Sequence, residues 1–283
     1  MNLIQQAFAH AVPKHIQRFP QGLRVLHAFQ SLLYSRNATI SRAVKRATHN
    51  FRGVLLDLGS GDGHFLFQLK NVRAHRVIAL DRNADWMRFM EDYQARHGLL
   101  RHAEVEFHCA DLDGDFLSHQ TDVSLIFCFS VLPYVSDPGH VFARLAKIAR
   151  PGAQLLLYTP VDFQTVLPLY RWMFKGFQHY ESMQMRRALH SSDELTAIAK
   201  KHGFVLASSQ KTYGFLGKIG HECWSISTML LGADNPLWQV LGAVSLPLTM
   251  PMTVLLGFLD RRLPIQHGNG WMAQFVLLAE PES

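Results

Sequence analysis

The sequence predicts an α/β protein in which a largely parallel sheet carries helices on both faces. From Val54 onward, short apolar runs alternate with amphipathic stretches of helical period, which is the pattern of a repeated strand–helix unit. A glycine-rich turn, Gly59–Gly63, follows the first apolar run directly. Sheets of this class bind their ligands beyond the carboxyl ends of the strands, so the turn is the first candidate for a binding site.

The first five strands and the helices between them follow from this alternation. The expected strands are residues 54–58, 77–80, 105–108, 123–127 and 154–158. The expected helices cover residues 65–69, residues 86–94 and a segment that begins at Ser136 or Asp137. That segment has Pro138 in its first turn and Pro151-Gly152 as its stop, which is the usual placement of these residue types at helix ends.

The second half of the chain completes the sheet and adds two insertions. Ser191 with Glu194 three residues later forms a capping box, which predicts a helix that ends at Gly203. Strands six and seven are expected at residues 204–208 and 271–279. An aromatic-rich, helical insertion is expected at 161–190, and an apolar insertion at 214–270.

The apolar insertion contains residues 237–259, a run without any charged residue that is long enough to span a bilayer. Pro247 and Pro251 argue against one straight helix. A true span would also remove the last strand from its sheet. We therefore expect a broken helical pair that dips into the bilayer interface, or the wall of an apolar substrate tunnel. A subdomain that packs on itself or forms a homodimer interface is the remaining alternative.

Cysteine and histidine spacing favours neither a metal site nor a disulfide framework. The three cysteines are far apart, without a CxxC pair, and the histidines are scattered without HExxH spacing. We therefore expect no metal. The N-terminus shows no pattern of a secretory signal, so the expected location is cytoplasmic.

The net charge of +6 is concentrated at the N-terminus. Residues 1–56 contain eight Lys and Arg and no Asp or Glu, with apolar residues at roughly helical spacing. A basic amphipathic arm is typical of proteins that bind an anionic membrane surface or a nucleic-acid backbone. A transit peptide has the same composition, and a plain helical cap with a basic outer face is the fourth interpretation.

The spacing of the glycine turn selects a ligand class. Gly59, Gly61 and Gly63 form GxGxG, and His64 stands where the dinucleotide fingerprint needs a glycine, so a pyrophosphate is disfavoured. Asp57 suits an ammonium group. Asp81, at the end of the second strand, can accept hydrogen bonds from ribose hydroxyls, and Asp111, after the third strand, from an exocyclic amino group. An ammonium, a ribose and an adenine without phosphate describe S-adenosylmethionine.

Four motifs resemble the class I S-adenosylmethionine-dependent methyltransferases in order and spacing. They are VLLDLGSGDG (54–63), VIALD (77–81), CADLDG (109–114) and residues 123–157. The resemblance implies a Rossmann-like, seven-stranded sheet whose last strand is antiparallel. The cofactor-binding residues that it implies are Asp57, Gly59, Gly61, Gly63, Asp81, Arg82, Asp111, Leu112 and Phe129, and it places Ser130 near the reactive methyl group.

One departure from the family concerns catalysis. Many relatives have Leu-Glu-His where this chain has Leu132-Pro133-Tyr134, which puts a phenol near the cofactor mouth. The candidate catalytic residues are His221 and His179 as proton acceptors, with Tyr134 as a positioner. His190 and Glu222 are further candidate bases, because they also lie in segments expected on the substrate side.

The predicted function is methyl transfer to an oxygen or carbon of a hydrophobic small molecule, such as a quinone precursor, polyketide, aryl lipid or isoprenoid. A peripheral position on the inner membrane face agrees with the basic arm. The alternatives are an RNA or protein methyltransferase that grips its substrate with this arm, and a non-catalytic scaffold subunit; nucleic acid is the less favoured partner. The expected parts are a basic helical cap (1–50), a cofactor-binding core (51–160), a substrate lid (161–190), the apolar insertion (214–270) and the segments that complete the sheet (191–213 and 271–283).

Overall fold

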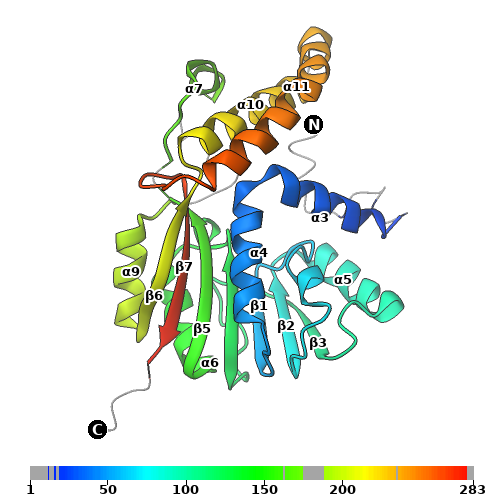
Figure 1. The fold of residues 1–283 in the computed structure, drawn as a ribbon. Helices are drawn as coiled ribbons and strands as arrows, with labels where there is room; N and C mark the ends of the chain where they lie inside the picture. The colour runs from blue at the N-terminus through cyan, green and yellow to red at the C-terminus, as the bar shows by residue number, and fades with distance from the viewer. Residues whose placement is uncertain are drawn as a thin grey trace. The chain divides into compact units, whose positions relative to one another are not determined.

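The computed structural model describes residues 12, 16, 19–161, 163–174, 188–233 and 235–278 (Figure 1). The chain forms two compact units, each assembled from separate stretches of sequence. Unit 1 comprises Met1–Thr39, Asp162–Arg186 and Lys211–Gly270. Unit 2 comprises Ile40–Val161, Arg187–Gln210 and Trp271–Ser283.

Unit 2 is built on the seven-stranded sheet that the sequence predicts. The strand order is β3-β2-β1-β4-β5-β7-β6, and the pairs β1/β2, β1/β4, β2/β3 and β4/β5 are parallel. The last strand is antiparallel, which confirms the prediction (Figure 1). The strands are β1 (Val54–Leu58), β2 (Arg76–Asp81), β3 (Glu104–Cys109), β4 (Val123–Phe129), β5 (Ala149–Pro160), β6 (Phe204–Thr212) and β7 (Gly270–Leu277).

The helices of unit 2, together with α4 (Ser35–Ala47), which crosses from unit 1 into unit 2 at Ile40, begin and end largely where the sequence signals place them. The Asp137 side chain accepts a hydrogen bond from the Gly139 backbone N–H and caps its helix, and Ser191 does the same for Glu194. The segment 65–69 is a correction: it forms only a 3₁₀ turn, because four residues close too few hydrogen bonds to sustain an α-helix. The other elements are η1 (Leu66–Leu69), α5 (Ala84–His97), η2 (Leu132–Tyr134), α6 (Pro138–Ile148) and α9 (Ser192–Lys201).

The core of unit 2 explains why its strands are apolar throughout. Every residue of β4 is buried, because this central strand has neighbours on both edges and packed layers on both faces. Three phenylalanines join α6 to the far strands: the Phe142 ring lies 5.9 Å from Phe204 and 6.3 Å from Phe275. The sheet is therefore a rigid support for the loops at its carboxyl edge.

The helices of unit 1 are α3 (Gly22–Leu33), α7 (Pro168–Phe174), α10 (Phe215–Leu231) and α11 (Pro236–Asp260). Helices α10 and α11 form an antiparallel hairpin, since the Gly214 N–H before α10 donates to Asp260 at the end of α11 over 2.9 Å. By length and composition α11 could cross a membrane, and only 17% of its most apolar window is buried.

Helix α11 corrects the expectation of a broken helical pair. Pro247 and Pro251 lie inside one continuous helix. Proline removes a backbone donor from the helix, so Pro247 and Pro251 leave the carbonyls of residues 243 and 247 without their usual N–H. The stretch between them packs against α10, where Ser245 Oγ donates to Ser227 Oγ over 2.9 Å and Thr249 Oγ1 lies 3.0 Å from the same oxygen. Packing against a neighbouring helix lets a helix continue through proline.

Candidate functional site

The candidate site lies where the order of the strands reverses. Strand β1 has β2 on one edge and β4 on the other, so the loops that follow β1 and β4 leave the carboxyl edge side by side. This switch point is the usual ligand crevice of open α/β sheets. The chain places the turn Gly59–Gly63 after β1 and Phe129-Ser130 at the end of β4.

The turn after β1 requires glycine for two reasons. Gly59 has φ +68° and Gly63 has φ +73°, in the left-handed region that side chains rarely adopt. A β-carbon at Gly59 would also overlap Cγ2 of Val131, and one at Gly63 would overlap the methyl of Met90. The N–H groups of Gly59 and Ser60 both donate to Leu80 O, over 2.7 and 3.0 Å, which ties the turn to β2. The turn thus presents bare backbone to a ligand.

Asp57 is a buried carboxyl at the end of β1, 3% exposed. Burial, and after it the carboxylates of Asp81 and Asp62, together raise its pKa to about 8. Among the residues that the structure describes, no Lys, Arg or His forms an ion pair with Asp57. A cationic ligand would supply the missing charge, so the site fits the ammonium of a bound amino acid.

Asp81 holds the turn from the opposite side. Its Oδ2 accepts from the Gly61 N–H over 2.9 Å, and its Oδ1 accepts from the Asn83 N–H over 2.8 Å. Burial raises the pKa of Asp81, and these backbone hydrogen bonds oppose the shift. Each carboxylate oxygen keeps a further lone pair, so the pair of oxygens can still accept from two vicinal hydroxyls.

The loop after β3 begins with three closely spaced acids, and the structure separates their roles. Asp113 accepts from both the N–H and the hydroxyl of Ser136, over 2.7 and 3.0 Å. Asp115 pairs with Arg144 at 2.7 Å. The exposed Asp111 accepts from the nearby Asp113 N–H over 3.0 Å by its Oδ1 and binds no other side chain in the described part of the chain, so it is the acid left for a ligand. The side chain of Leu112 belongs to the core, so only its backbone can serve a ligand.

An aromatic group follows the turn and the end of β4. The Phe65 ring packs edge-on against Phe129 with centroids 4.7 Å apart, and Phe127 stacks on Phe129 at 5.2 Å. Ser130 has φ +62°, and its N–H donates to Tyr158 O over 2.7 Å. A non-glycine residue held in this conformation is strained, and such strain gathers at functional sites.

Two residues that the sequence assigned to different roles come together. The Arg82 guanidinium lies over the Tyr134 ring at 5.7 Å, within the range of a cation–π contact. Arg82 was predicted to bind the cofactor and Tyr134 to position the acceptor. The contact therefore links the segment that follows β2 to the η2 turn that follows β4.

The predicted bases do not form one group. His221, on α10 of unit 1, lies against the rings of Tyr213 at 5.3 Å and Tyr34 at 6.4 Å. The neighbouring Glu222 faces elsewhere: its carboxylate oxygens accept from the N–H groups of Val166 and Leu167 over 2.8 and 2.6 Å. Burial raises the pKa of Glu222, and these two bonds oppose the shift. Glu222 is thus an anchor for the segment before α7.

The remaining candidate bases are His179 and His190. His179 lies outside the described residues. His190, in unit 2, contacts Glu194 through Nδ1 at 2.9 Å, and its buried Nε2 has no partner among the described residues. His190 is therefore the candidate base that shares a unit with the cofactor-binding residues.

Sequence reasoning missed three residues of the site. Phe65 supports Phe129, Met90 fills the space under Gly63, and Asn83 caps α5 with its side chain while its N–H holds Asp81. The spacing Asp81-Arg82-Asn83 carried a signal for the last of these, because asparagine two residues after a strand end is a common helix cap.

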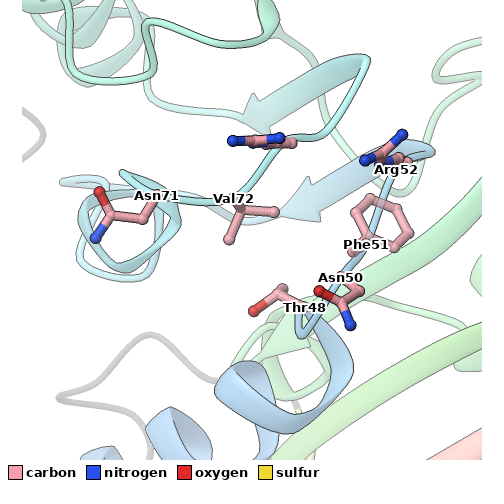
Figure 2. A pocket seen from close by; sticks show the side chains of 7 residues that line it. Thr48, Asn50, Phe51, Arg52, Asn71 and Val72 are labelled. Carbon is pink, nitrogen blue, oxygen red and sulfur yellow. The ribbon is translucent and has the colours of Figure 1, made fainter.

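A separate hollow of about 240 Å³ lies at the opposite edge of the sheet (Figure 2). Its lining residues precede β1 and β2, since Phe51 and Arg52 lead into β1 and Val72 and Arg73 lead into β2. This hollow is therefore at the amino ends of the strands and is not the crevice formed by the glycine turn.

Comparison with known proteins gives a family and a fold. A family model described as a methyltransferase domain matches residues 32–209. The tRNA 5-carboxymethoxyuridine methyltransferase of Escherichia coli (strain K12) is 33% identical over 104 residues, which cover 36% of this chain and 38% of that protein. The match therefore spans well under half of this relative.

Two solved structures share the fold. The cyclopropane synthase MmaA2 from Mycobacterium tuberculosis has a TM-score of 0.56 at 16% identity, over 86% of this chain and 84% of that chain. A geranyl diphosphate methyltransferase in complex with S-adenosylmethionine has a TM-score of 0.55 at 11% identity, over 86% of both chains. At such identities the likeness shows the fold alone.

Proposed function

Because the chain belongs to the methyltransferase-domain family and its cofactor is S-adenosylmethionine, we propose that it methylates an oxygen or carbon of a hydrophobic small molecule. The family and the cofactor agree with those predicted from the sequence. The observation that carries the proposal is the buried Asp57, which has no ion pair with a described cation and lies beside a glycine turn that Asp81 holds from the other side.

Each cofactor-binding residue has a distinct task in this proposal. Asp57 binds the ammonium, the turn Gly59–Gly63 lets the amino-acid end approach the backbone, and Asp81 accepts from the ribose hydroxyls. Asp111 and the Leu112 backbone serve the adenine. When bound, S-adenosylmethionine supplies an electrophilic methyl group on a sulfonium, so alignment of the acceptor and exclusion of water are the main demands on the chain.

Water exclusion and acceptor placement fall to the aromatic residues of unit 2. Phe65 and Phe129 provide an apolar surface beside the turn, and Tyr134 offers a hydroxyl for positioning. His190 is the candidate proton acceptor that shares this unit, and His221 and His179 remain alternatives from the inserted segments. A histidine is suited to the task because its ordinary pKa lies near neutrality.

The nature of the acceptor is inferred from unit 1. Its inserted segments continue the chain directly from the carboxyl ends of β5 and β6, and both are rich in apolar residues. Trp172 on α7 is 73% exposed and Phe215 on α10 is 65% exposed. Apolar segments that follow the carboxyl ends of these strands favour a hydrophobic acceptor, such as a quinone precursor, polyketide, aryl lipid or isoprenoid. One structural neighbour is named for an isoprenoid, geranyl diphosphate.

An RNA acceptor is the second candidate, and one comparison favours it. The E. coli relative is named for a modified uridine of tRNA, and the basic N-terminal residues could bind phosphates. Against this, residues 237–259 contain no charged residue at all, whereas RNA-binding insertions are typically rich in Lys and Arg.

Calorimetry with S-adenosylhomocysteine tests the cofactor site. Asp81→Ala removes both a ribose acceptor and the brace of the turn, so we expect affinity to fall by about 100-fold or more. Asp85→Ala is the matched control, because Asp85 lies close by but pairs with Arg88 at the surface. Equal affinities for the two variants would contradict the assigned role of Asp81.

The acceptor class is tested by following radiolabelled methyl groups. The purified protein and labelled S-adenosylmethionine are added to an extract of cells that lack the gene, and the products are divided into organic-soluble and RNA fractions. We expect label in the organic fraction, and a mass increase of one methylene in the labelled compound. Label in RNA alone would replace the first candidate with the second.

A further inference from the structure

The hairpin of α10 and α11 has its polar groups inside and its apolar groups outside. Four hydroxyl side chains, Ser227, Ser245, Thr249 and Thr253, lie in the seam between the two helices. Ser227 Oγ contacts Thr249 Oγ1 at 3.0 Å, and Ser245 Oγ donates to Ser227 Oγ over 2.9 Å. Thr253 Oγ1 donates across the seam to Gly220 O over 2.7 Å. A helical hairpin of a water-soluble domain has the reverse arrangement.

Glycines let the two backbones approach closely along the same seam. A β-carbon at Gly242 would overlap the Leu231 backbone N, and one at Gly220 would lie 3.2 Å from Thr253 Cα. Small residues at the contact with hydroxyls bonding across it are the packing mode of helices in lipid, where association cannot depend on burying apolar side chains.

The outer surface of α11 is apolar along its whole length. Val240, Val244, Leu248 and Leu255 are 57–73% exposed. At about 100° per residue the exposed positions cover about half of the circumference, and 25 residues extend about 37 Å. An exposed apolar surface of this extent marks an interaction site. The exposed apolar side chains of α11 are Leu237, Trp238, Val240, Leu241, Val244, Leu248, Leu255, Phe258 and Leu259.

Charge complementarity identifies an anionic surface as the neighbour. The residues of unit 1 include eleven Lys and Arg and five Asp and Glu, so unit 1 carries the entire net charge of +6 and unit 2 has none. At the end of α11, the Arg262 guanidinium lies over the Phe258 ring at 4.1 Å. Basic side chains at the ends of membrane helices rest their apolar stems on neighbouring apolar groups and keep the charge at the lipid headgroup level.

From this arrangement we infer that the α10–α11 hairpin inserts its outer surface into the hydrocarbon of one leaflet of an anionic membrane. Both ends of the hairpin connect to strands of the same sheet, β6 and β7, so the hairpin enters and returns on one side. The connection between the helices carries one acid, Asp234, and the cost of burying a charge favours a shallow entry with this connection at the headgroups. The match to the methyltransferase family ends at residue 209, before the hairpin, so the membrane role is independent of the proposed reaction.

Flotation of the full chain with lipid vesicles tests this inference. One set of vesicles is phosphatidylcholine alone, and the other is an equal mixture of phosphatidylcholine and phosphatidylglycerol. We expect the protein to float with both, and more completely with the mixture, because the apolar contact needs no charge while the basic residues add attraction. High salt should remove only the preference for the mixture. Protein that stays at the bottom with both vesicle types overturns the inference.

Substitutions of exposed apolar residues on α11, compared with control substitutions elsewhere, test which surface contacts the membrane. Val240→Gln, Val244→Gln and Leu248→Gln together should lower vesicle binding by about 100-fold or more, since three side chains lose their apolar environment. The control pair is Val205→Gln with Leu278→Gln, which are exposed on β6 and after β7, and it should bind as the unchanged chain does. Equal flotation of the triple variant and the unchanged chain overturns the inference, provided that circular dichroism shows both folded.

Tryptophan fluorescence measures insertion directly. Trp238 is exposed near the start of α11, and brominated phosphatidylcholine should quench its emission. The quenching should be reduced in Trp238→Phe. The competing occupant of the apolar surface is a second copy of the chain. Sedimentation that shows a dimer converted to monomer by the triple substitution, with no flotation of the unchanged protein, assigns the surface to that copy and overturns the membrane inference.

Discussion

Replacing Asp57 by asparagine should stabilise the protein relative to the unchanged chain, by an amount that grows as pH rises, while it removes the binding site for the cofactor's ammonium. The structure buries the Asp57 carboxyl beside Asp81 and Asp62 without a described cation. Its pKa is about 8 in the folded protein, against 3.8 for a free side chain. Between these two values the folded state holds a proton that the unfolded state has released.

The sign and the size of the effect follow from this difference. Folding takes up a proton in the window from pH 3.8 to about 8, so the free energy of unfolding falls as pH rises across it. The slope is at most about 1.4 kcal/mol per pH unit, and the whole shift corresponds to about 6 kcal/mol. Asparagine has nearly the same shape and no proton to release, so Asp57→Asn should lack this contribution to the slope.

Urea denaturation of the ligand-free protein from about pH 5 to about pH 9 provides the measurement. The stability of Asp57→Asn relative to the unchanged chain should increase with pH and level off above the folded pKa. Asp85→Asn serves as the control, because it changes a surface carboxylate paired with Arg88 and should keep the original slope. Parallel pH profiles for Asp57→Asn and the unchanged chain would refute the claim that Asp57 is buried without a cation.

Three further predictions concern the site and its supports. Binding of S-adenosylhomocysteine at neutral pH should release a proton from Asp57, so that calorimetric heats differ between phosphate and Tris buffers; identical heats would count against the ammonium contact. Gly59→Ala should lower the free energy of unfolding by about 3 kcal/mol, and Gly152→Ala by about 1 kcal/mol. Both glycines have positive φ, but only the β-carbon added at Gly59 would overlap Val131. Equal shifts in melting temperature would show that the turn can move aside. Glu222→Gln should cost about 1–3 kcal/mol and speed hydrogen exchange at the two N–H groups that its carboxylate binds, without changing cofactor affinity; unchanged exchange would rule out the anchoring role.

The fold could be predicted from sequence because its signals are local and agree with one another. Apolar runs such as residues 123–127 are strands in a buried sheet, and caps such as Ser191 fix helix ends from neighbouring residues alone. The cofactor-binding acids were also accessible, because each follows a strand and the carboxyl ends of parallel strands share one edge. Their individual contacts to the ligand remain predictions.

Features that depend on tertiary packing were not accessible in the same way. The prolines of α11 suggested a break, but the helix is continuous and packs against α10, where Ser245 and Thr249 both contact Ser227. The partner of Glu222 lies more than fifty residues away in sequence. One sequence pattern does indicate a continuous helix here: Ser245, Thr249 and Thr253 recur every four residues, which places them on one face of a helix.

The order of the strands also constrains how the chain assembles during synthesis. Strand β7 lies between β5 and β6 in the sheet, yet the ribosome makes it last of the three, after the whole α10–α11 hairpin. Until β7 emerges, β6 lacks its neighbour in the sheet, and the apolar outer surface of the hairpin is already available to whatever it meets. Domains generally fold as units as they emerge, so here the hairpin can bind its neighbour before β7 completes the sheet.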